Sequence, residues 1–349
     1  MSEGCPRVTV GVPVFNGESV LAETLDSLLN QTFSDFEIVI SDNGSADRTE
    51  QICRAYAARD PRVRYYRHAV NRGAAWNHNH VFELARGEYF KWNSADDLCA
   101  PEFLARCVAA LDRDPAAVMA TSEAVVIDEC GKRQSLSVPG QTLLPVVPFG
   151  ASAHVRFRRN IQMKHLCMTI YSLIRSDVLR QTDLIGGYAD SDRTLLAHLA
   201  LFGHCAVIPE VLFFNRDHPR RFSRVHADDY HCGWRETPNW FDPSNSKRKV
   251  FPFWKKSFEL WRVIHRNPLK WQDRLRCYWV LLQWLLEKDN MLRLYSDATH
   301  YPRKWVVRRF PRAKLAWNSL RGKRDIVRQV GSAQAGHEVS SQGVFGAKR

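Results

Sequence analysis

The stretch from Val8 to Ser45 reads VTVGVPVFNGESVLAETLDSLLNQTFSDFEIVISDNGS, and its pattern decides the fold class. Val8–Phe15 and Phe36–Ser41 are rich in β-branched and aromatic residues, and each run stops at residues that favour turns. Between them, Glu18–Asn30 places leucines at helical spacing and carries acidic residues early, where the helix dipole favours them. A strand, a helix and a strand in this order predict parallel strands joined by a covering helix.

The same alternation continues as far as Ile127. Helical patterns cover Asp47–Arg59, Ala74–Arg86 and Pro101–Leu111, and strand patterns cover Val63–Tyr66, Glu88–Trp92 and Val118–Ile127. This alternation predicts an α/β fold with a mostly parallel central sheet flanked by helices.

Polar clusters follow three of the predicted strands: Asn16–Gly17, Asp42–Ser45 and Ser94–Asp97. Because ligands of such sheets bind at the carboxyl ends of the strands, we expect these clusters to form one site.

The pattern loosens after Gly131. Residues 132–165 are interrupted by prolines and predict a long connecting region. Further on, the sequence predicts a strand over Met168–Ile174, a helix over Asp192–Leu201 and a strand over Ala206–Phe214. From about 251 to 320 the chain is helical in pattern, basic and rich in tryptophan.

Composition narrows the class of protein. The 349 residues are 45% hydrophobic and 25% charged, as in globular proteins, and 50 basic against 37 acidic residues predict an anionic partner. No apolar run reaches the ~18 residues of a spanning helix, and Met1–Arg7 lacks the apolar core of a signal peptide. Nine cysteines without a C-x-x-C pair favour reduced thiols, so we expect a cytoplasmic protein.

Adjacent carboxylates at Asp96 and Asp97, with Asp42 after an earlier strand, indicate a divalent cation site. Hard oxygen ligands suit Mg²⁺ or Mn²⁺, which also accept diphosphate oxygens. The alternative is a helix cap before Pro101 with ordinary surface charge.

Two further strings have competing interpretations. Asp42–Ser45 is typical of a tight turn, and the same residues suit contact with a nucleoside base or ribose. His78, Asn79 and His80 lie in a predicted helix, where neighbours do not share a face, so they predict a helix surface rather than a metal site. The chain has neither G-x-G-x-x-G nor a P-loop, which removes support for dinucleotide and P-loop enzymes.

The ordered motifs resemble those of the family 2 glycosyltransferases. They are VTVGVPVFN at 8–16, FEIVISDNGSAD at 36–47, NRG at 71–73, ARGEY at 85–89 and DDLCAPEFL at 96–104. A later block, GYADSDRTLLAHLALFG at 187–203 followed by PEVL at 209–212, resembles the acceptor-side segment of that family. The resemblance implies a GT-A fold and an inverting enzyme that uses a nucleotide sugar.

The resemblance also implies roles for particular residues. The residues that would contact the nucleotide sugar are Pro13, Phe15, Glu18, Asp42, Asn43, Arg72 and Asp96. Asp96 and Asp97 would hold Mn²⁺ or Mg²⁺, and Asp192 would be the catalytic base.

The sequence departs from the family pattern at two positions. Ser94 replaces the first carboxylate of the D-x-D motif, which leaves coordination to Asp96 and Asp97. Ser191 replaces the Glu that often precedes the base, so Asp190 competes with Asp192 for that role. His218 is a further candidate metal ligand, with a surface-loop histidine as the alternative.

These features divide the chain. Residues 1–220 are predicted to form the GT-A catalytic domain, with a nucleotide-sugar half over about 1–130 and an acceptor half over 131–220. Residues 221–330 are predicted to form a helical region, and residues 331–349, which have little apolar content, to form a disordered tail.

Tryptophans beside lysines and arginines in the helical region suit an anionic membrane surface, and equally suit helices that pack on the catalytic domain. They are Trp254, Lys255, Lys256, Trp261, Arg262, Trp271, Arg274, Arg276, Trp279, Trp284 and the stretch from Trp305 to Arg312. We therefore expect a cytoplasmic protein with peripheral contact at the inner face of the cell membrane as an open option.

The expected partners are a nucleoside diphosphate sugar and a glycan or lipid-linked acceptor. Two alternatives stay open: a metal-dependent nucleotidyltransferase, and a basic nucleic-acid-binding protein. The first lacks a phosphate-binding loop after the first strand, and the second lacks a recognisable binding motif, so we expect no nucleic acid partner.

Overall fold

The structure, a computed structural model, describes residues 4–134, 150–162, 167–219, 221, 238–244 and 251–309. Two compact units divide the chain, residues 1–293 and residues 294–349. The tail predicted over 331–349 lies outside the described residues.

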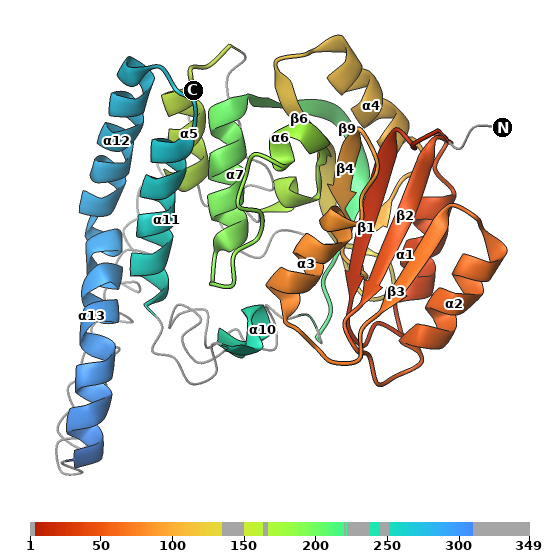
Figure 1. Ribbon diagram of the computed structural model, residues 1–349, viewed down its shortest axis with the longest axis horizontal. Coiled ribbons are helices and arrows are strands. Elements are labelled where there is room, and N and C mark those ends of the chain that lie inside the picture. The colour runs from red at the N-terminus through yellow and green to blue at the C-terminus, as the bar shows by residue number, and fades with distance from the viewer. Residues whose placement is uncertain are drawn as a thin grey trace, which may run out of the picture. The chain divides into compact units, whose positions relative to one another are not determined.

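The first half alternates strands and helices as the sequence predicts (Figure 1). Its elements are β1 (Val8–Val14), α1 (Leu21–Leu29), β2 (Phe36–Asp42), α2 (Thr49–Arg59), β3 (Val63–Arg67), α3 (Ala74–Glu83) and β4 (Tyr89–Trp92). Helix α1 begins three residues later than predicted, because Glu18 is held outside it: its backbone N–H donates to Asp47 and its carboxylate accepts the N–H of Arg48.

The second half is less regular. Its elements are β5 (Leu98–Cys99), α4 (Phe103–Arg113), β6 (Ala117–Ile127), β7 (Arg133–Gln134), α5 (Ala153–Gln162), a 3₁₀ helix (Met168–Tyr171), β8 (Leu173–Arg175), α6 (Ser176–Leu179), α7 (Ser191–Phe202), β9 (His204–Arg216) and α10 (Pro238–Phe241).

Two expectations for this half are wrong. Met168–Ile174 is a 3₁₀ turn followed by a short strand, since a short apolar run does not by itself distinguish a buried helical turn from a strand. The predicted connecting region 132–165 contains helix α5, whose apolar face is too narrow to show in the sequence: its buried residues are Phe157 and Asn160.

The strands form one sheet in the order β3-β2-β1-β4-β8-β6-β9-β5, with β7 beside β6. Strands β1, β2, β3 and β4 pair in parallel, as do β6 and β9. Strand β8 is antiparallel to both β4 and β6, so β4 and β6 run in the same direction. The mostly parallel sheet therefore brings the carboxyl ends of β1, β2, β4, β6 and β9 to one edge.

Helices cover both faces of the sheet, as a parallel sheet requires. On one face, Val8, Val10, Val12 and Val14 of β1 join a buried cluster with α1 and α4. On the other, Val81 and Phe82 of α3 and the leucines of α7 pack with Phe90 and Trp92 of β4. A Cβ on Gly11 would lie 2.7 Å from Phe90 and 2.8 Å from Val81, so glycine there admits this close packing.

Three helices follow: α11 (Pro252–Arg266), α12 (Trp271–Leu286) and α13 (Lys288–Arg309). Within the first unit, α11 packs beside α7, and α12 beside α5 and α11 (Figure 1). None of the helices in the described part of the chain combines the length and apolar character needed to cross a membrane.

Candidate functional site

The loops that follow β1, β2 and β4 are tied together at the carboxyl edge of the sheet. The backbone N–H of Asn16 donates to Ser45 Oγ over 2.8 Å, and that of Asn43 donates to the carbonyl of Val14 over 2.9 Å. The N–H of Asn93 donates to the carbonyl of Gly11 over 2.9 Å. The three polar clusters that the sequence singles out therefore lie along one edge.

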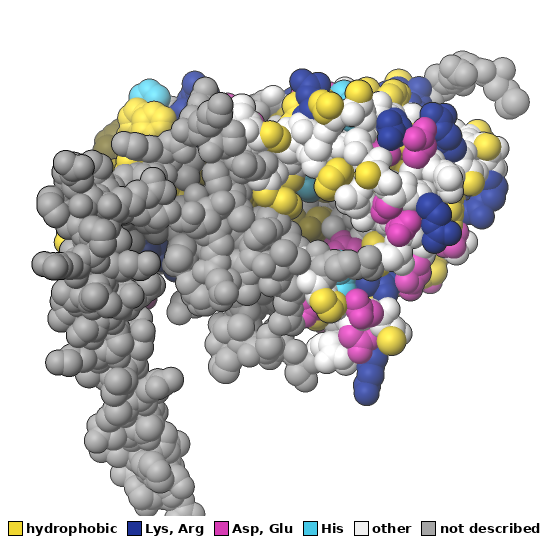
Figure 2. Space-filling model, turned by 90° about the horizontal axis from the view of Figure 1, so that it is seen from below, with side chains coloured by type: hydrophobic (Ala, Val, Ile, Leu, Met, Phe, Trp, Pro, Cys, Tyr) yellow, Lys and Arg dark blue, Asp and Glu magenta, His cyan; other side chains and the backbone are white. Residues whose placement is uncertain are grey.

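Figure 2 looks onto the lower side of Figure 1 and shows described acidic and basic side chains interspersed there. On the visible part of this face, the excess of basic residues does not gather into one patch of described side chains.

Asp42 is fully buried at the end of β2. Its Oδ1 accepts the N–H of Ser45 and its Oδ2 accepts the Tyr65 hydroxyl, both over 2.9 Å. The carboxylate thus forms the turn that follows β2, and this turn shapes the candidate nucleotide side of the edge.

Asn43 links the loop after β2 to the loop before α3. Its side-chain oxygen accepts the N–H of Arg72 over 2.9 Å, and its amide nitrogen donates to Asn71 and to the carbonyl of Gly73. Asn43 and Arg72 are therefore brought together, as expected of residues in one site.

The guanidinium of Arg72 lies 4.0 Å from the centroid of Trp76, whose ring stacks on His80. Trp76 was not among the residues predicted from the sequence. It lies in the first turn of α3, four residues after the loop residue Arg72, and an aromatic residue at this helix start was the available signal.

The three residues at the end of β1 differ in exposure. Pro13 is buried in the strand opposite Ser41, Phe15 is 48% exposed, and Glu18 pairs with Arg48. Phe15 is thus the residue of the three that presents a free ring surface at this edge.

Asp96 lies in the loop after β4. One carboxylate oxygen accepts the Ser94 hydroxyl, and Oδ2 lies 3.1 Å from His218 Nε2. Burial alone would raise the pKa of Asp96, but the hydrogen bonds from His218 and Ser94 and the charge of Arg221 hold it below its usual value. Asp96 and His218, which are 122 positions apart in sequence, therefore lie side by side, and their role as metal ligands stays a prediction.

Asp97, the next residue in the loop after β4, is buried and forms hydrogen bonds to the end of β9. Its carboxylate accepts the Asn215 amide over 2.9 and 3.1 Å and the N–H of Arg216 over 2.9 Å. Burial, followed by the charge of Asp96, raises the pKa of Asp97 to about 7. Both of its oxygens face donors of the protein itself.

Asn215 and Arg221 were not predicted from the sequence to belong to the site. The Arg221 guanidinium donates to Asn215 Oδ1 over 2.7 Å. A polar pair at the end of β9, Asn215–Arg216, was the available signal, because β9 ends at the same edge as β4.

The side chains of Asp96 and His218 could bind a divalent cation whose other ligands come from a bound nucleotide sugar and water. Among the described residues no three His, Cys, Asp or Glu side chains form a closed metal site. The Asp96 carboxylate is a hard oxygen ligand, and the His218 ring, 3.1 Å from it, offers a nitrogen ligand at the same place. Mg²⁺ commonly binds through one or two protein ligands plus phosphate oxygens and water.

Asp190 and Asp192 flank the start of α7 in different surroundings. Asp190 precedes the helix with a φ of 62°, and its Oδ2 accepts the Lys256 ammonium over 2.9 Å. Burial would raise the pKa of Asp190, yet the charges of Lys256 and Arg193 keep it low. Burial and the charge of Asp190 raise the pKa of Asp192, whose carboxylate accepts the adjacent N–H of Arg193. Neighbouring carboxylates with opposite pKa shifts are typical of acid–base sites.

The pKa of the buried Tyr171 phenol reflects several charged groups. Burial raises this pKa, as do the charges of Asp97, Asp96 and Asp192, whereas the charge of Arg221 lowers it. Asp192 and the Asp96 loop therefore both act on this phenol.

His78, Asn79 and His80 are half-buried and have separate partners. His78 Nδ1 bonds the carbonyl of Ala74, Asn79 bonds the backbone of Ile185, and His80 stacks on Trp76.

Residues 9–178 match the family model of Glycosyl transferase family 2. The putative glycosyltransferase EpsE of Bacillus subtilis (strain 168) is 32% identical over 144 residues, 41% of this chain and 50% of EpsE. The chain thus spans about half the length of this curated relative and smaller shares of others.

Two solved structures are similar. S. aureus TarS 1-349 in complex with UDP-GlcNAc has a TM-score of 0.53 and 17% identity, over 84% of this chain and 87% of that one. The mannosyltransferase PcManGT from Pyrobaculum calidifontis, in complex with GDP-Man and Mn2+, has a TM-score of 0.47 and 17% identity, over 85% of each chain.

The TarS likeness agrees with the predicted GT-A arrangement of the sheet and helices. The family match spans β1 to α6 and holds the loops that meet at the carboxyl edge. Through its residues 9–178, this chain belongs to glycosyl transferase family 2.

Proposed function

We propose that this protein is an inverting glycosyltransferase that moves a sugar from a nucleoside diphosphate sugar to a hydroxyl group of a glycan or lipid-linked acceptor. In this reaction the bond between the anomeric carbon and the diphosphate oxygen breaks. The acceptor oxygen forms the new bond from the opposite face, its proton passes to a carboxylate, and the nucleoside diphosphate leaves.

The observation that carries the proposal is the contrast between Asp190 and Asp192. Asp190 is engaged with Lys256 at 2.9 Å, whereas no ion pair is recorded for Asp192 within the described residues. Its raised pKa makes Asp192 a better proton acceptor than an ordinary carboxylate. We assign Asp192 as the general base and Asp190 as the residue that fixes the start of α7.

On the donor side, the ring of Phe15 and the Arg72–Trp76 pair offer surfaces for the nucleoside and its phosphates. Asp96 and His218 would hold Mn²⁺ or Mg²⁺, and Asp97 would fix the Asp96 loop against β9. A divalent cation held there would supply positive charge against the departing diphosphate.

A screen of nucleotides and nucleotide sugars with Mn²⁺ tests the donor side. A ligand that binds the folded chain raises its melting temperature, and a true donor also releases nucleoside diphosphate. We expect UDP-, GDP- or dTDP-sugars to act, and excess EDTA to abolish the release. Asp96→Asn should lower release by orders of magnitude with little change in folding, whereas Asp35→Asn, at an exposed position before β2, should change neither.

Other outcomes of this screen would contradict the proposal. Turnover of nucleoside triphosphates with pyrophosphate release would indicate a nucleotidyltransferase. Binding to DNA without any nucleotide response would indicate a nucleic-acid-binding protein, and full release in excess EDTA would remove the cation from the mechanism.

A further inference from the structure

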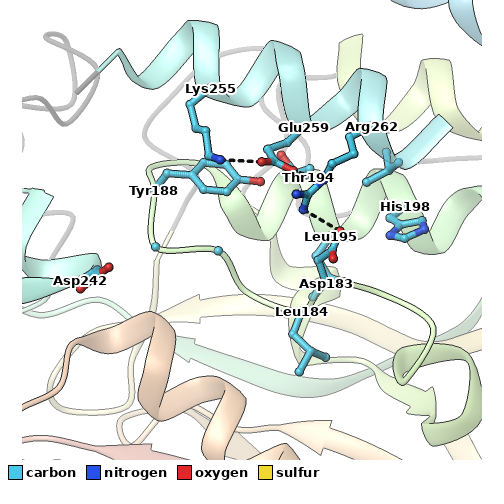
Figure 3. Close-up of a pocket in the computed structure, with 13 residues that line it drawn as sticks. Asp183, Leu184, Tyr188, Thr194, Leu195, His198, Asp242, Lys255, Glu259 and Arg262 are labelled. Atoms are coloured by element: carbon cyan, nitrogen blue, oxygen red, sulfur yellow. Dashed lines mark hydrogen bonds and ion pairs between the residues drawn. The ribbon is translucent and has the colours of Figure 1, made fainter. Parts of the chain in front are cut away.

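A pocket of about 330 Å³ lies between the loop at 183–188, helix α7 and helix α11 (Figure 3). Asp183 and Tyr188 come from the loop, Thr194 from α7, and Glu259 and Arg262 from α11. The volume is at the lower end of the range for small-molecule sites, so the pocket suits a ligand the size of one sugar ring.

One wall of the pocket is a row of side chains with alternating positive and negative charge, joined by ion pairs. The Lys255 ammonium lies 2.7 Å from Glu259, the Arg262 guanidinium lies 2.8 Å from both Glu259 and Asp183, and Figure 3 shows this row. Asp242 also lines the pocket, and Asp183 pairs in addition with Arg266 over 3.3 Å, so the three carboxylates of the lining balance the three neighbouring cations. Burial lowers the pKa of His198 to about 4, so this side chain adds no charge near neutral pH. The wall therefore does not favour a phosphate or carboxylate ligand.

The same wall can bind hydroxyl groups. Carboxylate oxygens accept hydrogen bonds, the guanidinium donates them, and the Thr194 and Tyr188 hydroxyls lie in the same pocket. Leu184, Leu195 and Val263 supply apolar surface. Planar charged groups beside apolar side chains match the hydroxyl edges and C–H faces of a neutral sugar, and match an alkyl chain poorly because burying these charges against it is costly.

The pocket shares its supporting elements with the proposed base. Thr194 and Asp192 both lie in the first turn of α7, where residues two apart leave the helix on different faces. Lys255 is next to Lys256, which pairs with Asp190. The Asn79 amide bonds both the N–H and the carbonyl of Ile185, which fixes the loop at 183–188 against α3.

All of the lining residues lie between 183 and 263, beyond the family match at 9–178. The candidate donor-side residues Pro13 to Asp97 lie within that match. Selectivity for the ligand of this pocket is therefore a property of the chain beyond the matched segment.

We propose that this pocket binds a neutral sugar residue of the acceptor beside the turn of α7 that carries Asp192. The inference rests on the proposed function, because it takes the occupant to be the glycosyl acceptor.

The test uses the full chain and a panel of methyl glycosides of glucose, galactose, mannose and N-acetylglucosamine, with inorganic phosphate as the competing class. Ligand-observed NMR measures their binding with UDP and GDP present to occupy the nucleotide site. We expect at least one glycoside to bind and phosphate not to displace it. Asp183→Ala removes a carboxylate that can accept hydrogen bonds from sugar hydroxyls. This variant and Glu259→Gln should each weaken glycoside binding roughly tenfold or more.

Asp183→Ala should fold normally, since half-exposed ion pairs add little stability. The control is Phe258→Ala, a substitution on the exposed side of α11 outside the pocket, which should leave glycoside affinity unchanged. Absence of glycoside binding, displacement by phosphate, or unchanged binding in both pocket variants overturns the inference.

Nucleotide-induced melting shifts separate this result from the proposed function. Shifts without glycoside binding would overturn the pocket assignment and leave the transferase proposal standing. Glycoside binding that depends on Asp183, without any nucleotide response, would support a sugar site and overturn the transferase proposal.

Discussion

Asp190 and Asp192 are two residues apart, yet their surroundings assign them different tasks. Asp192→Asn keeps a side-chain oxygen that can accept the N–H of Arg193 but removes the proton acceptor. We expect glycosyl transfer to fall about 10²-fold or more, with nucleotide binding and unfolding free energy unchanged. Steady-state transfer assays and urea unfolding measure these quantities.

Asp190→Asn is the matched variant for this assignment. It breaks the pair with Lys256, so it should lower the unfolding free energy and affect transfer far less than Asp192→Asn. If Asp190→Asn abolishes transfer while the variant stays folded, and Asp192→Asn does not, then Asp190 is the base.

The pH dependence of transfer should reflect the raised pKa of Asp192. Protonation inactivates a base, so the rate should fall on acidification with a midpoint above 3.8, the ordinary value of an aspartate. The charge of Asp190 contributes to this shift, and Asp190→Asn also leaves the Lys256 cation unpaired. Both effects stabilise ionised Asp192, so the midpoint should move to lower pH in this variant. An unchanged or higher midpoint would contradict the assignment.

Glu37 is a buried carboxylate that holds β2 to its neighbours. It lies 2.7 Å from Arg86 and 2.9 Å from Arg64 and accepts the Thr9 hydroxyl. Burial would raise the pKa of Glu37, but hydrogen bonds from Arg86, Thr9 and Arg64 outweigh it and keep the pKa low. We expect Glu37→Ala to lower the unfolding free energy by about 3 kcal/mol in urea unfolding, and Glu88→Ala, at an exposed pair, by far less.

The pH dependence of this stabilisation has a defined sign. A lowered native pKa gives stability that is complete above the unfolded value near 4.5 and is lost as pH falls through the native value. The difference between the wild type and Glu37→Ala should therefore shrink below that pH. If the difference in unfolding free energy between the wild type and Glu37→Ala stays constant down to acid unfolding, the ionised form of Glu37 does not provide the stabilisation.

At the scale of elements, the tryptophans of the C-terminal helices divide into two groups. Trp284 is buried in α12 and stacks on Phe253, which is the packing role that the sequence left open. Exposed apolar residues recur every three or four positions on both helices: Trp254, Phe258 and Trp261 on α11, and Trp271, Leu275, Trp279, Leu282 and Leu286 on α12. This spacing places each set along one helix face.

We expect these faces to bind anionic vesicles at low salt, with affinity that falls as salt rises. The double variant Trp271→Ser/Trp279→Ser should weaken vesicle co-sedimentation several-fold, because it removes apolar area from the exposed face of α12. Val70→Ser, at an exposed apolar residue of a loop in the first half, is the control. If the intact protein does not bind anionic vesicles at low salt, the exposed apolar faces of α11 and α12 do not bind membranes.

At the scale of the whole molecule, both buried clusters and all predicted site residues lie within the unit at 1–293. We expect a chain ended after Arg293 to unfold in one cooperative transition and to show the same nucleotide-induced melting shift as the full chain. Denaturant unfolding and melting curves compare the two. A broad transition, or loss of the nucleotide response, would show that residues 294–349 stabilise the first unit.

Local patterns in the sequence determined the alternating first half and the edge where its loops meet. Period-two and helical spacings are set by neighbouring residues, and a parallel sheet places the carboxyl ends of its strands together. Hence the turns at Asp42 and Asp96 could be predicted from residues a few positions apart, whereas the pairing of Asn43 with Arg72, 29 positions on, was implied only by the family resemblance. The narrow apolar face of α5 and the 3₁₀ turn at Met168 carried no such signal.

Only the tertiary structure decided which side chains these turns meet. The contacts of Asp97 with Asn215 and of Asp96 with His218 span 118 and 122 positions, and they depend on β9 running parallel to β6. The difference between Asp190 and Asp192 likewise depends on Lys256 arriving from α11. Periodicity and turn signals report a residue's own neighbourhood, whereas charge, burial and pKa depend on partners that only the folded chain brings within a few ångströms.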